Sequence, residues 1–447
     1  MAILGIVGTE ALASQRFKNV RRSVFYDYPN GAAPLTGLTS LMEDESTNDP
    51  EFNWWEKRLK EQRTITATQG SSKGPFFAAD GTTDAGDPVT LAAGTQYQVK
   101  VADSTQFRVG HVIRIPVTVS NVTSAKPLVA VITAITSSTL IKFLCIETLA
   151  GVDNGVTNEN VGLEVLVIGS AHGQGAVGSS NNVLNIPVNP SNYAQIFRTS
   201  MTITGSQLKT SLKYDETGAY KDMAKEAAIN HMREIEFGFI FGRATKNITD
   251  STNNLPTYTT GGILWHMEQW EAGTLYEVTA STADTDDNKR IIANSSGNLS
   301  EKDYDNYLER VFRVTNNKAN EKLVLCGSGF LNVINRMYKS KTVLNSDLPL
   351  TADYGMNVVK HITPFGTIFY KTHPLFTMNS TLRNNALFVD VGNLRYRYLD
   401  GRDTELLTNR QPNDADYRKD EWLTEAGLEV RYPESNLYLQ NVQNYVP

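Results

Sequence analysis

The sequence predicts an α+β protein in which an all-β domain is inserted ahead of a mixed α and β region. Three observations lead to this prediction. Residues 70–188 are rich in Val, Thr, Gly and Ser and have almost no helical periodicity. A long helical pattern follows over Thr217–Lys246. After residue 300, helical and strand patterns alternate without forming a repeating βαβ array.

Length and charge narrow the possible classes of protein. With 447 residues the chain exceeds a single core, so two or three packed units are expected. Its 42 basic and 48 acidic residues give a net charge of −6, and no basic stripe marks a surface that grips nucleic acid. The four basic residues nearest the start predict a solvated arm; they are Arg16, Lys18, Arg21 and Arg22.

Cysteine usage and hydropathy exclude further classes. Cys145 and Cys326 lie far apart in neither a redox nor a metal-binding spacing, so the chain is not a disulfide scaffold. No stretch approaches the roughly 20 apolar residues of a membrane span. We therefore expect synthesis in the cytoplasm and no membrane partner.

The first elements along the chain are an arm, a helix and a strand. Residues 1–48 contain several Pro and Gly residues and no sustained period, which predicts an extended arm that lies on another surface. Asp49 can cap a helix that begins at Pro50 and places Phe52, Trp55 and Leu59 on one face. Thr64–Thr68 is a short β-prone run.

The segment 70–188 contains five runs with strand character, separated by turn residues. This spacing predicts a small barrel or sandwich. The runs are Tyr97–Val101, His111–Ile115, Val129–Ile135, Leu140–Ile146 and Leu163–Ile168.

A strand over Tyr193–Thr204 precedes the clearest helix, Thr217–Lys246, which would span about 45 Å. One stripe of that helix includes His231, Ile235 and Phe239. Its paired glycines, at positions 238 and 242, predict a close backbone contact, because glycine inside a helix costs about 1 kcal/mol.

Downstream, the pattern predicts two helices and several strands. The helices are Tyr304–Val314 and Phe330–Tyr338; the strands are Leu323–Leu325, Val358–Ile362, Thr367–Tyr370, Ala386–Val391, Leu394–Tyr398 and Leu428–Tyr432.

Motifs that resemble catalytic or ligand sites fail on their physical requirements. Gly173, Gly175 and Gly178 spell a dinucleotide fingerprint, but the prolines at 187 and 190 leave no room for the helix that must hold the pyrophosphate. Asp284 begins a calcium-like loop that lacks the required glycine and final glutamate. Cys326–Gly329 lacks the first glycine of a nucleophile elbow, so a tight strand-to-helix turn is the better interpretation.

The six histidines do not pair at metal-ligand spacing. We therefore expect no cofactor, no metal and no catalytic residue, and the sequence favours a structural protein over an enzyme.

Several phrases of the sequence resemble a family of phage head proteins, in that family's order. They are DPEFNWWEKRL (Asp49–Leu59), FRVGHVIRI (Phe107–Ile115), NYAQIFRTSMTITG (Asn192–Gly205), HMREIEFGFIFG (His231–Gly242), GGI (Gly261–Ile263) and LTEAGLEVRYPES (Leu423–Ser435). Together they resemble the major capsid protein of a tailed bacteriophage with the Hong Kong 97-type fold. That fold has an N-terminal arm, a β-hairpin called the E-loop, a long spine helix, and peripheral and axial domains.

The resemblance implies a domain layout. It makes 1–48 the arm, 49–69 the start of the peripheral domain with the first E-loop leg, 70–188 the inserted β-domain, 189–215 the returning leg, 216–250 the spine helix, and 251–447 the axial and peripheral domains. Within it, Thr64–Thr68 and Ile196–Thr204 would be the two legs of the E-loop. We expect the insertion to face outward, where space allows it.

The resemblance also implies function. Copies of the chain would form hexamers and pentamers of an icosahedral shell around double-stranded DNA, without sequence-specific binding, and would reside in the virion. Scaffolding, portal and decoration proteins are further expected partners. The residues expected at the assembly interface are Arg16, Arg21, Arg22, Trp54, Trp55, Phe197, Arg198, His231 and Phe239.

Three alternatives stay open on the sequence alone. The first is an encapsulin-type compartment shell, and the second is another virion component such as a tail tube or decoration protein. The third is an enzyme with an unrecognised site. Assembly state distinguishes them, because an enzyme is expected to be a small oligomer.

Overall fold

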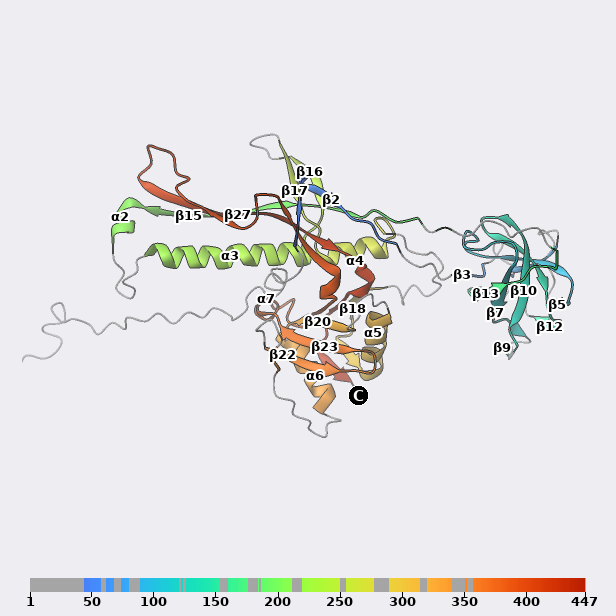
Figure 1. Cartoon of the computed structure of the whole chain (residues 1–447). Coiled ribbons are helices and arrows are strands. Elements are labelled where there is room, and N and C mark those ends of the chain that lie inside the picture. Colours follow the sequence, from blue (N-terminus) through green and yellow to red (C-terminus); the bar gives the residue numbers. More distant parts are fainter. Residues whose placement is uncertain are drawn as a thin grey trace, which may run out of the picture. The chain divides into compact units, whose positions relative to one another are not determined.

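The structure is a computed structural model of the whole chain (Figure 1). It describes residues 44–57, 62–67, 74–79, 89–119, 122–123, 126–152, 160–175, 184, 186–210, 219–249, 255–276, 289–313, 320–339, 350–351 and 357–446. The arm predicted for 1–48 therefore lies almost wholly outside the described residues, as does the calcium-like loop at Asp284. The chain divides into two compact units, which are considered separately.

The second unit, Asn53–Ser191 with Met267–Arg290, contains a closed β-barrel. Its strands pair antiparallel around the barrel in the order β3 (Arg63–Ile65), β13 (Glu164–Ser170), β7 (His111–Ile115), β10 (Leu128–Ser137), β11 (Leu140–Cys145) and β6 (Gln96–Lys100). A bridge from Thr66 to Val101 joins the two ends, where Ala67 N donates to Lys100 O at 2.9 Å. The predicted strands are present, and they close as a barrel.

Small additions complete this unit. β4 (Phe76–Ala78) pairs with β6, and a four-stranded sheet has the order β5 (Val89–Leu91), β12 (Leu149–Val152), β8 (Thr118–Val119) and β9 (Val122–Thr123). The barrel is filled by inward side chains such as Phe76, Ile113 and Phe143, all fully buried. Their alternation with outward residues gives each strand its period of two.

The first unit, Met1–Phe52 with Asn192–His266 and Ile291–Pro447, contains a long sheet and a long helix. The sheet has the order β1 (Asp44–Thr47), β25 (Leu394–Leu399), β27 (Tyr417–Val430) and β15 (Gln195–Thr204), and β26 (Glu405–Leu407) also pairs with β27. Helix α3 (Ala219–Phe241) runs alongside β15 and β27 (Figure 1).

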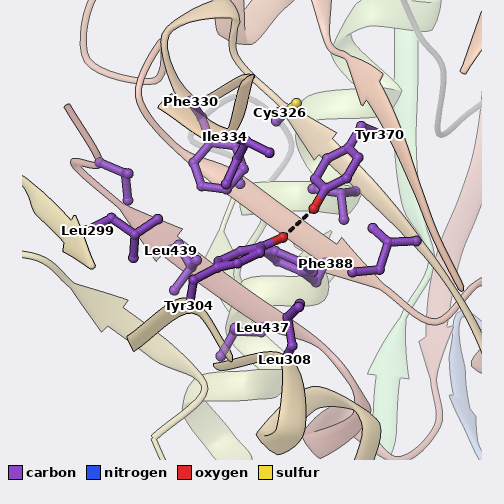
Figure 2. Close-up of a cluster of buried hydrophobic side chains, with 14 of the residues drawn as sticks. Leu299, Tyr304, Leu308, Cys326, Phe330, Ile334, Tyr370, Phe388, Leu437 and Leu439 are labelled. Carbon is purple, nitrogen blue, oxygen red and sulfur yellow. Dashed lines mark hydrogen bonds between the residues drawn. The ribbon is translucent and has the colours of Figure 1, made fainter. Parts of the chain in front are cut away.

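The same unit contains a seven-stranded mixed sheet. Its order is β18 (Ile291–Ala293), β28 (Leu437–Gln440), β24 (Ala386–Val389), β20 (Glu321–Cys326), β23 (Thr367–Thr372), β22 (Asn357–Ile362) and β21 (Leu350–Thr351). Helices α5 (Glu301–Arg313) and α6 (Ser328–Lys339) pack on it. Figure 2 shows the core between them, where the Tyr304 and Tyr370 hydroxyls hydrogen-bond among apolar side chains. The helices and strands predicted downstream of residue 300 are confirmed.

The remaining elements are short. They are β2 (Glu51–Asn53), which pairs with β14 (Ser191–Tyr193), α2 (Gly205–Lys209), β16 (Thr245–Thr249), which pairs with β17 (Pro256–Thr259), α4 (Ile263–Glu271), β19 (Asn298–Ser300), which pairs with β29 (Asn444–Val446), α7 (Pro374–Met378), and the 3-10 turns η1 (Val391–Asn393) and η2 (Pro433–Ser435).

Three expectations need correction. The helix predicted for Asp49–Leu59 is wrong in its described part, which is extended and contains β2, with every second residue from Phe52 to Glu56 buried. Helix α3 ends five residues before Lys246, because Gly242 closes its last turn on Gly238 O at 2.9 Å and then accepts a hydrogen bond from Gly262 N.

The third correction concerns the E-loop legs. The strands expected to pair as legs lie in different sheets, since β3 pairs with β13 and β15 pairs with β27. The segments that do pair around the inserted domain are β2 with β14 and, beyond them, Glu56 with Val188.

Candidate assembly surfaces

The seam between α3 and the long sheet is built from aromatic residues. Phe239 is fully buried, and its ring meets Phe197 on β15 edge to face at 6.3 Å between centroids. The Tyr396 ring on β25 also meets the Phe239 ring edge to face, at 6.0 Å between centroids. Such contacts add to the free energy of burial. Both Phe197 and Phe239, expected at an assembly interface, are therefore packed inside their own chain.

His231 extends this seam with polar contacts. It is buried, and its two ring nitrogens hydrogen-bond with Thr199 Oγ1 at 3.0 Å and Thr424 Oγ1 at 2.8 Å. Burial lowers the pKa of its imidazole, which favours the neutral ring. The residue therefore links the helix to both long strands within one chain.

A second buried link holds the C-terminal half of α3. His373 Nε2, just before α7, donates to Glu236 Oε1 at 2.9 Å, and both side chains have no exposed surface. A buried polar pair of this kind fixes the position of the helix against its neighbours, because breaking the pair leaves a buried carboxylate without its partner. Sequence reasoning missed this pair, since the partners are 137 residues apart.

The opposite face of the long sheet carries a row of buried carboxylates on β27. Glu421 accepts from both Arg198 Nε and Arg198 Nη2, the latter at 2.9 Å, and Glu429 accepts from Arg397 Nε at 2.6 Å. The hydrogen bond from Arg198 holds the pKa of Glu421 below its usual range. Arg198 still exposes 56% of its side chain, so among the expected interface residues it stays at the surface.

The two adjacent tryptophans have opposite environments. Trp54 is buried, and its indole Nε1 donates to Glu56 Oε1 at 2.9 Å. Trp55 points the other way and is 70% exposed. Arg16, Arg21 and Arg22 lie outside the described residues.

Two further exposed apolar side chains were not predicted. Leu184 is 83% exposed and Ile186 is 78% exposed, on the segment that returns from the barrel to pair with Glu56. The sequence held one sign of this exposure, because Leu184 and Ile186 stand among asparagines and prolines and not in an apolar run. Large apolar groups that are exposed close together mark a surface that a partner covers.

The described residues offer little for chemistry. Among them no group of three His, Cys, Asp or Glu side chains is placed to hold a metal, and no helix there is long and apolar enough to cross a membrane. A cavity of about 620 Å³ is lined mostly by amide, hydroxyl and apolar side chains, including Asn384, Asn441 and Gln443. It contains no carboxylate, histidine or lysine that could act as an acid or base.

A family model decides the identity. The model of the SU10 major capsid protein matches residues 28–443. The chain belongs to the SU10 major capsid protein family. It is a major capsid protein, a structural component of the virion, and the resemblance to tailed-phage capsid proteins is confirmed. No curated protein matches it in sequence.

Several solved structures resemble this capsid protein distantly. A protein of Mycobacterium phage Bobi has 7% identity and a TM-score of 0.43, covering 98% of this chain and 99% of that one. A chain of the cyanophage A-1(L) capsid has 12% identity and a TM-score of 0.42, covering 62% and 85%. The SrpI encapsulin of Synechococcus elongatus has 10% identity and a TM-score of 0.37, covering 59% and 80%.

Proposed function

We propose that copies of this capsid protein assemble as hexamers and pentamers into a closed icosahedral shell that encloses the double-stranded DNA of a tailed phage. The observation that carries the proposal is the exposure of Trp55, Leu184 and Ile186 on the two segments that are bridged at Glu56 and Val188. A neighbouring copy that covers these side chains would remove their apolar surface from water. Self-complementary contacts of this kind are what a symmetric shell requires.

The Hong Kong 97-type layout is part of this proposal. Helix α3 takes the place of the spine helix, the seven-stranded sheet that of the axial domain, and the β2–β14 ladder that of the E-loop base. The boundaries at 48, 188 and 215 are proposed on the same basis, with 1–48 as the arm. The barrel already includes β3, before residue 69, and the spine helix ends at Phe241, before residue 250. The barrel is the insertion, and we expect it on the outer surface.

The proposal includes partners and place. The shell confines DNA without gripping it, in keeping with a net charge of −6 and no basic stripe. Scaffolding, portal and decoration proteins are further partners, and assembly takes place in the host cytoplasm. A structural role and not a catalytic one is part of the proposal, and the membership in a family of capsid proteins supports it.

The experiment compares Trp55→Ser with the conservative variant Trp55→Phe by size-exclusion chromatography with light scattering. The wild type and Trp55→Phe are expected to form megadalton particles. Trp55→Ser is expected to lose most of them while the dissociated chain keeps its stability, because Trp55 is 70% exposed in its own chain. A wild-type chain that stays a monomer or dimer at all salt and pH values, even with its scaffolding partner, contradicts the proposal.

A further inference from the structure

One part of the outside of the barrel in the second unit is aliphatic. Strand β10 buries Leu128, Ala130 and Ile132 in the barrel core, as alternation requires. The residues between them, Val129 and Val131, point outward and are also aliphatic. A strand that is apolar on both faces is typical of strands covered on both faces.

Neighbouring strands continue this outward surface. Val131 lies opposite Val112 on β7 and opposite Leu144 on β11. At the two ends of the row, Ile168 on β13 is 50% exposed and Ile146 after β11 is 49% exposed. We name this surface the barrel face; its aliphatic members are Val112, Val129, Val131, Leu144, Ile146 and Ile168.

The barrel face carries Arg114 and has two charged residues at its edges, Lys142 on β11 and Glu164 on β13. Arg114, outward on β7, lies opposite Val129 and opposite Leu166 on β13, and it is exposed. Among the described residues no carboxylate pairs with it. Glu164 begins β13 two residues before Leu166, is 49% exposed, and forms a surface ion pair with Arg63 at 3.2 Å.

We propose that the barrel face binds the barrel face of a second copy of this chain. Two copies related by a twofold axis would each cover the other's aliphatic row and would pair Arg114 of one copy with Glu164 of the other, twice. Arginine beside an apolar patch is a favourable interface residue, since its planar guanidinium binds carboxylates in a fixed geometry.

The barrel face is small, and this favours a second copy of the chain over an independent partner. A standard interface uses roughly 20–30 residues a side, many more than the barrel face offers. The barrel face can therefore bind a partner only where another contact already holds the two surfaces near each other. Such a contact raises the effective concentration of one surface at the other to about the millimolar range. Neighbouring copies in a shell meet that condition, so the inference rests on the proposed shell function.

The test uses shells of the full chain and measures the urea concentration at which they dissociate. Val131→Asp puts a charge in the middle of the barrel face, and Ser138→Asp puts the same charge on the exposed β10–β11 turn. We expect Val131→Asp to weaken the contact about tenfold or more, and Ser138→Asp to behave as the wild type. Equal dissociation midpoints for the wild type, Val131→Asp and Ser138→Asp would overturn the proposal.

A charge exchange tests the pairing without altering the apolar row. Arg114→Glu should lower the dissociation midpoint, and the double variant Arg114→Glu with Glu164→Arg should restore it. No restoration would refute the twofold pairing. Circular dichroism of the dissociated chains checks that each barrel folds.

Should the wild type form no shell, the shell function fails, and sedimentation of the free chain then decides the barrel face. Association at millimolar concentration that Val131→Asp abolishes supports the contact, and its absence rejects it.

Discussion

Phe239 distinguishes a core role from an interface role, because the two make opposite predictions for Phe239→Ala. The side chain is fully buried between α3 and the long sheet and touches the rings of Phe197 and Tyr396. If the structure is right, the substitution weakens the folded chain itself. If Phe239 instead contacted another subunit, the isolated chain would be unaffected and only assembly would suffer.

The expected magnitude follows from the environment. Removing a buried phenyl ring loses its transfer free energy and leaves a cavity, which together cost about 3–5 kcal/mol. That range includes the two edge-to-face ring contacts, each of which contributes about 0.5–1.5 kcal/mol. The site cannot collapse easily, since the backbone at Gly262 lies against the Phe239 carbonyl.

The assay is urea unfolding of the dissociated chain, followed by circular dichroism at helical wavelengths. Met232→Ala is the matched control, because Met232 lies on the same helix and is 45% exposed. We expect the control to change the free energy of unfolding by less than about 0.5 kcal/mol. A loss below about 1 kcal/mol for Phe239→Ala would refute the packing described for this seam.

Further predictions concern charge and close packing. Glu421 has a pKa below its unfolded value of 4.5 because Arg198 hydrogen-bonds to it, so its contribution to stability is present above pH 4.5 and is lost as the pH falls through the lower folded value. Glu421→Gln should therefore lower stability at neutral pH and flatten the acid limb of a pH titration. Lys322→Met should cost about 3–5 kcal/mol in urea unfolding, because it leaves the buried Asp390 carboxylate unpaired; a double variant with Asp390→Leu should recover most of the loss. Gly242→Ala should cost about 1–3 kcal/mol and lower the melting temperature, since the added Cβ meets the Thr260 carbonyl at 2.5 Å.

The region around Trp54 explains why one element was mispredicted. Asp49 followed by Pro50 is a strong helix start, and Phe52 with Trp55 fits a helical face. The real period is two, with Phe52, Trp54 and Glu56 buried. A buried glutamate hid that period, since its burial requires partners such as the Trp54 indole, which donates a hydrogen bond to it.

Strand β27 was largely missed for the same reason. Only its last residues were predicted, because Glu421, Glu425 and Glu429 suggest an exposed loop. In the structure each of them is at most 5% exposed and lies beside an arginine from another part of the chain. Local patterns cannot reveal such pairs. The long helix and the strands β20, β22, β23 and β24 have apolar patterns of their own and were predicted, whereas β18, β21 and β28 were not.

The residues expected at the assembly interface fall into two groups, those packed within their own chain and those that stay exposed. The stripe containing His231 and Phe239 was correctly identified as apolar and contact-forming, but its partner is the chain's own sheet. Sequence periodicity finds a face that must be covered and does not say by which chain. Trp55 stays exposed, and its interface role stays a prediction.

Electron cryo-microscopy of the particles formed by the full chain tests the central claim most directly. The account predicts a closed shell of pentamers and hexamers, in which Trp55 is covered by a neighbouring copy and Phe239 is covered by its own sheet. Particles that are small oligomers, or a shell in which Trp55 faces solvent and Phe239 contacts a neighbour, would contradict it.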